Sequence, residues 1–194
     1  MRRLVIAVDC DDVLIRTTPF FVDAYNRQYG TKVTLDKAHI GDEIWETDRS
    51  TLEDRWAELM KTEEYRTLAP SADEIAVLTA LAKDHELHVI TARRSHERES
   101  TQLVLDTHLP EVFTSLELVG FTGSKGEVCE RINADVLIDD NLRHLEDAVK
   151  HGLPKEGAIL FGDYAWNIDS KDGFTRCHTW AEVQKEIDQL VRSK

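Results

Sequence analysis

The sequence lacks several features that would place the protein in a well-known class. Its three cysteines, Cys10, Cys129 and Cys177, form no Cys-x-x-Cys pair, which argues against a disulfide framework or a structural zinc site. No apolar run approaches the roughly 20 residues of a membrane-spanning helix. The P-loop, the Gly-x-Gly-x-x-Gly fingerprint and the Gly-x-Ser-x-Gly elbow are also absent. We therefore expect a cytoplasmic protein outside the classes that these motifs mark, with no membrane partner.

Positive charge is scarce as well. The 194 residues carry 37 acidic and 24 basic side chains, which gives a formal net charge of −13. A nucleic-acid surface needs clustered basic residues, so no nucleic-acid partner is expected. The length suits one domain, or one domain with an insert. The sequence reveals no interface and leaves both a monomer and a homodimer open.

Short apolar runs alternate with amphipathic stretches along most of the chain. Capping boxes at residues 71–74 and 179–182 mark the starts of two helices. Strands separated by helices predict an α/β fold, a Rossmann-like parallel sheet flanked by helices. The buried strands are predicted at residues 4–8, 87–91, 115–119, 136–138 and 158–161.

One long segment after the first strand breaks this alternation because it contains no buried-strand run. Phe21, Tyr25 and Tyr29 recur every four residues and so share one helix face, and Ser50 is the predicted N-cap of a second helix. The segment is therefore predicted to be a small helical cap inserted after the first strand. The expected division is residues 1–15 and 71–194 for the core and residues 16–70 for the cap.

The most informative feature is a pair of acidic clusters at predicted strand ends. Asp9, Asp11 and Asp12 follow the first strand, and their mutual repulsion is unfavourable unless a cation offsets it. Asp139 and Asp140 end another strand, so both clusters would meet at the carboxyl edge of the sheet, where ligands bind in such folds. Mg²⁺ prefers such hard oxygen ligands. The alternative interpretations are a solvated turn and a helix N-cap.

Two further residues are predicted to lie at the same edge. Thr91 ends a third strand, and its hydroxyl and the following backbone amides could hold a phosphate oxygen. Lys125 stands in a glycine turn at the expected start of a helix, where the macrodipole does not favour a cation, which suggests an anion or carboxylate partner. The alternatives are an ordinary strand-end threonine and an exposed lysine.

In chain order these features resemble the motifs of the haloacid dehalogenase (HAD) superfamily of aspartate-nucleophile phosphohydrolases. A response-regulator receiver combines similar residues, but its lysine follows all the acids, whereas here Lys125 precedes the second cluster. The resemblance implies a HAD-like fold with a cap after the first strand. The four motifs are Asp9-Cys10-Asp11-Asp12-Val13, Ile90-Thr91, Lys125 and Ile138-Asp139-Asp140.

The chain is also similar to the cytosolic and mitochondrial 5′(3′)-deoxyribonucleotidases. Those enzymes have glycine where Asp12 stands and Thr-Ser-Pro where this chain has Thr91-Ala92-Arg93. Their base-stacking aromatic residue aligns with Thr17, close to Phe20 and Phe21. The chemistry therefore carries over better than the nucleotide preference. The similarity is carried by residues 134–140, 159–161, 167 and 178–182.

The resemblance implies a magnesium-dependent phosphate monoester hydrolase that acts through an aspartyl-phosphate on a small phosphorylated metabolite, such as a nucleoside monophosphate. Asp9 would be the nucleophile and Asp11 the general acid and base, with Thr91 and Lys125 as further catalytic residues. Asp139 would orient Lys125 or bind the metal. The expected metal ligands are Asp9, Asp140 and Asp11, with Asp11 contributing its backbone carbonyl. The expected phosphate contacts are Thr91, the Ala92 amide and Lys125, and the expected substrate contacts are Phe20, Phe21 and Arg93.

Three alternatives stay open at this level. The aromatic residues after the first strand could build only the interior of the helical cap. A polynucleotide end phosphatase shares the same core, although the overall acidity disfavours it. A non-catalytic phospholigand-binding module would not need both Asp9 and Asp11.

Overall fold

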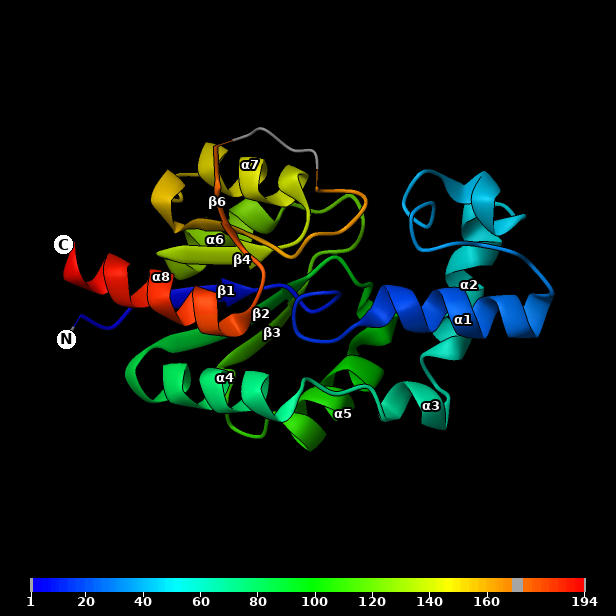
Figure 1. Ribbon diagram of the computed structural model, residues 1–194, viewed down its shortest axis with the longest axis horizontal. Coiled ribbons are helices and arrows are strands. Elements are labelled where there is room, and N and C mark those ends of the chain that lie inside the picture. The colour runs from blue at the N-terminus through cyan, green and yellow to red at the C-terminus, as the bar shows by residue number, and fades with distance from the viewer. Residues whose placement is uncertain (1, 169–172, 194) are drawn as a thin grey trace.

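The computed structural model describes residues 2–168 and 173–193, and a parallel six-stranded sheet forms its centre (Figure 1). The strand order is β3-β2-β1-β4-β5-β6, and every neighbouring pair is parallel. The predicted α/β fold is therefore confirmed. The strands are β1 (Val5–Val8), β2 (Glu86–Thr91), β3 (Ser115–Leu118), β4 (Val136–Asp139), β5 (Ala158–Phe161) and β6 (Thr175–Cys177).

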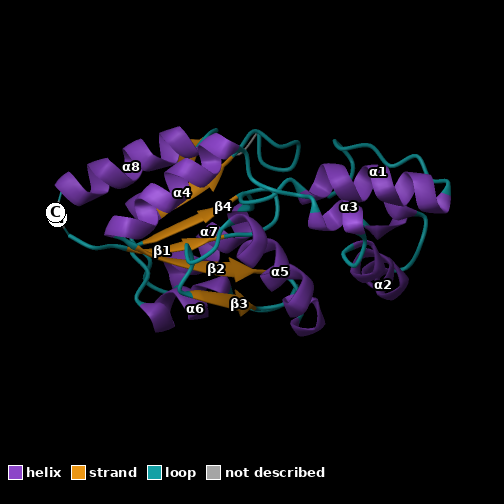
Figure 2. Ribbon diagram, turned by 90° about the horizontal axis from the view of Figure 1, so that it is seen from below, coloured by secondary structure: helices purple, strands orange, loops and turns teal. Residues whose placement is uncertain are grey.

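Helices cover both faces of the sheet (Figures 1 and 2). Strand residues alternate between two cores: Ile6 and Val8 pack with α4, α5 and α8, whereas Ala7 packs with α6 and α7. This double burial explains why the strands read as continuous apolar runs. The helices are α4 (Ala72–Asp84), α5 (Arg98–His108), α6 (Lys125–Ile132), α7 (Leu142–Lys150) and α8 (Trp180–Arg192), with the 3-10 turns η2 (Ser95–Glu97) and η3 (Lys155–Gly157).

A further group of helices lies beyond the carboxyl end of the sheet, to the right in Figure 1. Its aromatic residues pack on one another, with ring centroids 5.7 Å apart for Phe21 and Trp56 and 5.0 Å apart for Tyr25 and Trp45. Tyr25 is fully buried, so it belongs to the interior of this helical group. The elements are α1 (Thr17–Tyr29), η1 (Asp42–Trp45), α2 (Arg49–Leu59) and α3 (Glu63–Arg66).

Two local predictions were incomplete. Helix α2 begins two residues earlier than expected. Its N-cap is Asp48, whose carboxylate accepts hydrogen bonds from the Thr51 amide and hydroxyl, so the prediction of Ser50 as the cap was wrong. A carboxylate offers two acceptor oxygens and so can satisfy both donors at once. Strand β6 was not predicted because its sequence contains no apolar run, and only Cys177 in it is buried.

The capping box at the start of α4 is present in full. The Ser71 hydroxyl accepts a hydrogen bond from the Glu74 amide, and the Glu74 carboxylate accepts one from the Ser71 amide. We expect Ser71→Ala to lower the free energy of unfolding by about 1 kcal/mol, measured by urea denaturation. Glu74→Gln, which keeps an acceptor, is the matched control and should cost less; an equal loss in both variants would contradict the role of the Ser71 hydroxyl.

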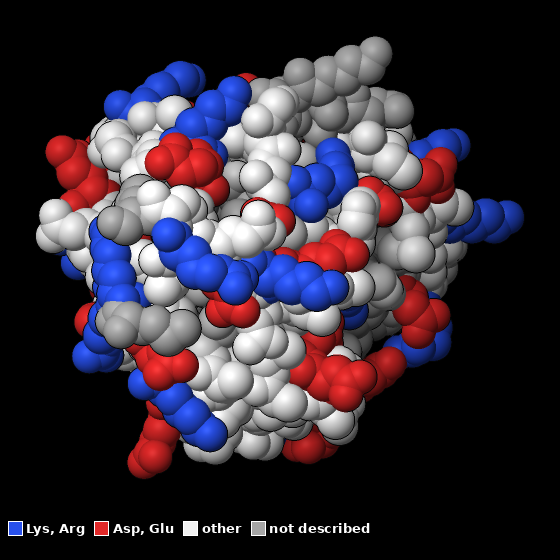
Figure 3. Space-filling view, turned by 60° about the vertical axis from the view of Figure 1, so that its left-hand side comes forward, with Lys and Arg blue, Asp and Glu red and all other residues white. Residues whose placement is uncertain are grey.

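Within the described parts of the chain, every helix is too short or too polar to cross a lipid bilayer. On the face that bears the two chain ends, basic and acidic side chains are interspersed, so neither sign of charge dominates it (Figure 3).

Candidate active site

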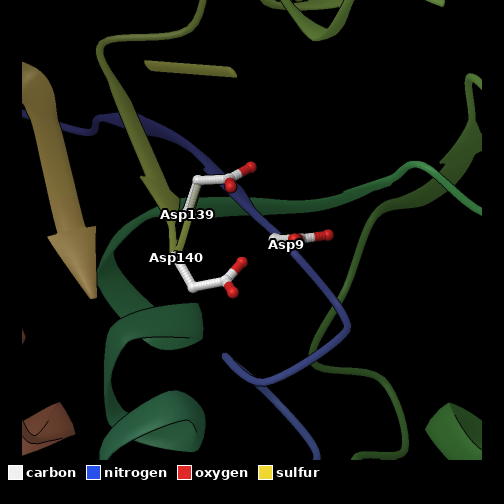
Figure 4. A group of neighbouring side chains, drawn as sticks. All are labelled: Asp9, Asp139 and Asp140. Atoms are coloured by element: carbon white, nitrogen blue, oxygen red, sulfur yellow. The ribbon is translucent and has the colours of Figure 1, made fainter. Parts of the chain in front are cut away.

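The two acidic segments leave the sheet side by side. Strands β1 and β4 are neighbours with Val8 paired to Ile138, and the Asp9 amide continues the ladder by donating to the Ile138 carbonyl at 2.9 Å. The carboxylates of Asp9, Asp139 and Asp140 therefore lie on the same side of the two strand ends (Figure 4). One oxygen from each lies within 4.8 Å of the others, and all three residues are buried.

Lys125 is the cation of this cluster. Its ammonium lies 2.8 Å from Asp9 Oδ1 and 2.7 Å from Asp139 Oδ2, and its side chain is fully buried. Burial disfavours a charged lysine, but the two carboxylates outweigh this cost and raise the pKa of Lys125 above its usual value. The partner of Lys125 in the structure is thus a pair of carboxylates, which accounts for a cation at the first position of α6.

Close helix packing places Lys125 at this point. A Cβ on Gly126 would lie only 2.5 Å from His151 Nδ1 and 2.6 Å from the Asp147 carbonyl, so only glycine lets the start of α6 approach α7 this closely. The Asp147 carboxylate accepts hydrogen bonds from the Gly126 amide and the Ser124 hydroxyl, each at 2.8 Å. These contacts fix the first turn of α6, and with it the direction of the lysine.

Burial is the main influence on the pKa values of Asp9 and Asp140. Burial raises the pKa of Asp9 to about 6, with Lys125 opposing this shift and Asp139 adding to it. Burial, together with Asp139 and Asp9, raises the pKa of Asp140 well above its usual value. Asp9 Oδ1 accepts from the Cys10 amide at 2.7 Å. Within the described residues, no hydrogen-bond donor contacts Asp9 Oδ2 or Asp140 Oδ1.

A neighbouring loop, which follows β5, orients Asp140. The Trp166 indole donates to Asp140 Oδ2 at 2.7 Å, and the side-chain amide of Asn167 donates through Nδ2 to the Asp140 carbonyl at 2.8 Å. The Trp166 ring also stacks on His39 from the α1–η1 segment, with centroids 3.8 Å apart. Sequence reasoning missed the contact between Trp166 and Asp140, because no spacing rule relates a loop after β5 to the end of β4.

Asp11 lies apart from this carboxylate group. Its two oxygens accept hydrogen bonds from Arg93 Nε at 2.9 Å and Nη2 at 2.6 Å, a bidentate pair. Burial acts to raise the pKa of Asp11, but the Arg93 guanidinium outweighs burial and holds it below its usual value. Arg93 also donates to Thr101 at 2.8 Å. The Asp11 carboxylate therefore stands outside the close group of Asp9, Asp139 and Asp140, and the guanidinium of Arg93, expected to contact the substrate, is occupied by Asp11.

Asp12 stands where the deoxyribonucleotidases have glycine, and its backbone conformation is one that glycine favours. Asp12 adopts a φ of 57°, the left-handed region that glycine enters without strain and aspartate tolerates better than most residues. Its carboxylate accepts hydrogen bonds from the Thr18 amide at 3.1 Å and from the Thr18 hydroxyl. Burial raises the pKa of Asp12 to about 7. This aspartate thus ties the loop after β1 to the first turn of α1.

The predicted phosphate and substrate contacts are distributed unevenly. Thr91 is fully buried, and its hydroxyl accepts from the Arg93 amide at 3.2 Å and donates to Asp11 at 3.4 Å. Ala92 and Phe21 line the cavity described next, whereas Phe20 packs against Tyr65 with ring centroids 5.6 Å apart and is absent from the cavity wall.

A cavity of about 770 Å³ opens above the acidic residues. Its volume falls in the range of roughly 300–1,000 Å³ that is typical of small-molecule sites. Asp9, Asp11 and Asp140 line it from the sheet edge. Its aromatic wall consists of Phe21, Trp45, Trp56 and Phe121. An arrangement of buried carboxylates, a buried lysine and a cavity of this size can act on a small ligand that carries an anionic group.

Solved structures with this architecture are numerous. The chain is similar to a predicted phosphatase from Clostridium acetobutylicum, at 16% identity over 98% of this chain and 100% of that chain, with a TM-score of 0.70. It is also similar to a haloacid dehalogenase-like hydrolase from Streptococcus pneumoniae, at 12% identity over 95% and 98% of the two chains, with a TM-score of 0.66. The Bacillus subtilis HAD-hydrolase YfnB, solved bound to magnesium, matches at 14% identity over 95% and 98%, with a TM-score of 0.63.

At such identities the likeness shows the fold alone, which is that of the HAD-superfamily hydrolases. A search of curated proteins found no match. The model of one protein family, described as "5' nucleotidase, deoxy (Pyrimidine), cytosolic type C protein", matches residues 3–194. The chain therefore belongs to this nucleotidase family and is a HAD-type phosphatase that resembles the 5′-nucleotidases.

Proposed function

We propose that this protein hydrolyses phosphate monoesters with the help of Mg²⁺, through an aspartyl-phosphate on Asp9, and that its substrate is a nucleoside monophosphate or a similar small phosphorylated metabolite. The observation that carries this proposal is the meeting of Asp9, Asp140 and Lys125 at the carboxyl edge of the sheet, under a cavity large enough for such a substrate.

The donor set suits Mg²⁺. Asp9 and Asp140 each keep a carboxylate oxygen to which no described residue donates a hydrogen bond, and carboxylate oxygens are ligands that Mg²⁺ prefers. Both oxygens of Asp139 are occupied, by Lys125 and by the Asn141 amide at 2.9 Å, so we assign Asp139 to orienting the lysine. When bound, Mg²⁺ would offset the repulsion between the nucleophile and the phosphate. Whether Asp11 also contacts the ion stays a prediction.

The remaining steps belong to the side chains. Asp9 attacks phosphorus, a bond forms between its oxygen and phosphorus, and the ester bond to the leaving alcohol breaks. Asp11 gives that alcohol a proton, then removes one from the water that cleaves the acyl phosphate and releases inorganic phosphate. Lys125 holds Asp9 in place, and Thr91 with the Ala92 amide holds phosphate oxygens. In the structure Asp11 is paired with Arg93, which holds its pKa low, so it must leave that guanidinium and take up a proton from solvent before it can protonate the alcohol.

Residues 16–70, whose helices lie within residues 17–66, serve this chemistry as a cap over a core of residues 1–15 and 71–194. This division is supported by their position beyond the sheet edge (Figure 1). A cap in this place would exclude water from the acyl phosphate until the alcohol has left.

Phosphate release from a panel of nucleoside monophosphates and sugar phosphates, measured with added Mg²⁺, tests this function. We expect turnover of at least one member, loss of that turnover on addition of a chelator, and recovery with excess Mg²⁺. A 3′-phosphorylated oligonucleotide in the same panel tests the polynucleotide alternative and should be a poor substrate. Absence of release from every member in the presence of Mg²⁺, or release that persists in chelator, would contradict the proposal.

A further inference from the structure

Three arginines gather around one residue of the cavity wall. The guanidinium carbons of Arg49 and Arg94 lie 5.5 and 5.6 Å from the centroid of the Phe121 ring. Arg143 donates to the Phe121 carbonyl through both Nη1 and Nη2, each at 3.3 Å. These residues come from α2, the loop after β2 and the start of α7, and all of them line the cavity. Elements far apart in the chain thus direct positive charge to one place.

The three arginines differ in whether a carboxylate forms an ion pair with them. Arg49 is paired with Asp42, with a closest approach of 2.6 Å, and Arg94 is paired with the buried Glu53. For Arg143, no carboxylate of residues 2–168 or 173–193 lies within 4.0 Å. Its described partners are a carbonyl oxygen and the ring of His144. The cavity wall therefore carries one guanidinium that forms no ion pair with a described carboxylate, in a chain of net charge −13.

Local structure gives no reason for a cation at position 143. Arg143 is the second residue of α7, at the helix end where the macrodipole disfavours positive charge. Its side chain is exposed and donates to a single carbonyl, a contact that lysine or glutamine could also make. A guanidinium fork is instead suited to bidentate binding of a phosphate or carboxylate.

The transferred phosphate already has a cation near it. In the proposed function that phosphate faces Asp9, whose own cation is Lys125, fully buried at the sheet edge. Arg143 is engaged instead with the loop after β3, which carries Phe121, the residue that Arg49 and Arg94 flank. The positive charge at this part of the wall is therefore available to another part of the ligand.

We propose, on the basis of the proposed function, that Arg143, supported by Arg49 and Arg94, binds a second anionic group of the substrate. The preferred substrates are then small phosphomonoesters that carry a further phosphate or a carboxylate. A charge-assisted hydrogen bond in a partly enclosed site makes this second group a determinant of KM.

Matched substrate pairs separate binding of a second anionic group from phosphate monoester hydrolysis in general. One pair is a nucleoside 3′,5′-bisphosphate and the corresponding 5′-monophosphate, which tests a phosphate; the other is 3-phosphoglycerate and glycerol 3-phosphate, which tests a carboxylate. We expect kcat/KM to favour the doubly anionic member of at least one pair by about tenfold, mainly through KM. This ratio exceeds the factor of two that a second scissile phosphate alone would give.

Variants then assign the effect to a residue. Arg143→Gln is expected to bring the ratio within the preferred pair close to one. Arg131→Gln, which removes an exposed arginine paired with Glu117 outside the cavity, is the matched control and should keep the wild-type ratio. Equal rates for both members of both pairs in the wild type would overturn the inference while leaving the proposed function intact. An equal loss for both members in Arg143→Gln would assign Arg143 to the transferred phosphate and overturn it as well.

Discussion

Asp9→Asn is expected to abolish turnover, with kcat/KM lower by at least about 10³-fold, because an amide cannot attack phosphorus as a carboxylate does. The variant should fold normally. Burial raises the pKa of Asp9 to about 6, so at pH 7 the native fold holds an ionised group that it disfavours, and the neutral amide has nearly the same shape. Lys125 would keep Asp139 as its partner. Phosphate release and the thermal unfolding midpoint, both measured at pH 7, check the two parts.

The matched control is Asp188→Asn, which removes an exposed acid of α8 that does not line the cavity. It should retain the wild-type rate and midpoint. Turnover of Asp9→Asn within tenfold of the wild type would reject Asp9 as the nucleophile. A loss of turnover accompanied by a much lower midpoint would instead indicate that Asp9 matters to the fold.

The large-scale arrangement was predictable because it depends on patterns that act along the chain. Apolar runs mark strands buried on both faces, and their alternation with amphipathic helices leaves a parallel sheet as the simplest solution. Once the sheet is parallel, the ends of β1 and β4 must lie on one edge. The proximity of Asp9 and Asp140 therefore follows from topology, without knowledge of any side-chain conformation.

Other features of the site depend on side-chain directions that no sequence pattern encodes. Asp9 and Asp11 are two residues apart, yet one faces Lys125 and the other faces Arg93. Arg93 had been expected to contact the substrate because a basic residue could attract it into an otherwise acidic molecule. In the structure the guanidinium of Arg93 pairs with Asp11 instead.

The burial of Lys125 was equally hard to foresee. A lysine in a glycine turn is usually exposed, and the sequence only suggested an anionic partner. The structure shows that Gly126 permits a close approach of α6 to α7, which carries the lysine under the sheet edge. The resulting network of Lys125, Asp9 and Asp139 joins β1, β4 and α6, so we expect it to contribute to the free energy of unfolding as well as to turnover.

Removal of that lysine is accordingly expected to destabilise the protein strongly. Lys125→Met should lower the free energy of unfolding by about 3–5 kcal/mol, because Asp9 and Asp139 would stay buried without their cation. Urea denaturation measures the change, and Lys185→Met, which replaces an exposed lysine of α8, should stay within about 0.5 kcal/mol of the wild type. A loss no larger than that of the control would contradict a buried ion network.

A double-mutant cycle separates the charge from simple loss of packing. Asp139→Asn alone leaves Lys125 with Asp9, whereas Lys125→Met with Asp139→Asn removes both members of the closest pair. We expect the double variant to lose about 1–3 kcal/mol less unfolding free energy than the two single losses add up to, because fewer buried charges are left uncompensated. Strict additivity would mean that the 2.7 Å contact between Lys125 and Asp139 contributes no coupling. Lys125 would then act on the fold through its packing, and its effect on turnover through Asp9 alone.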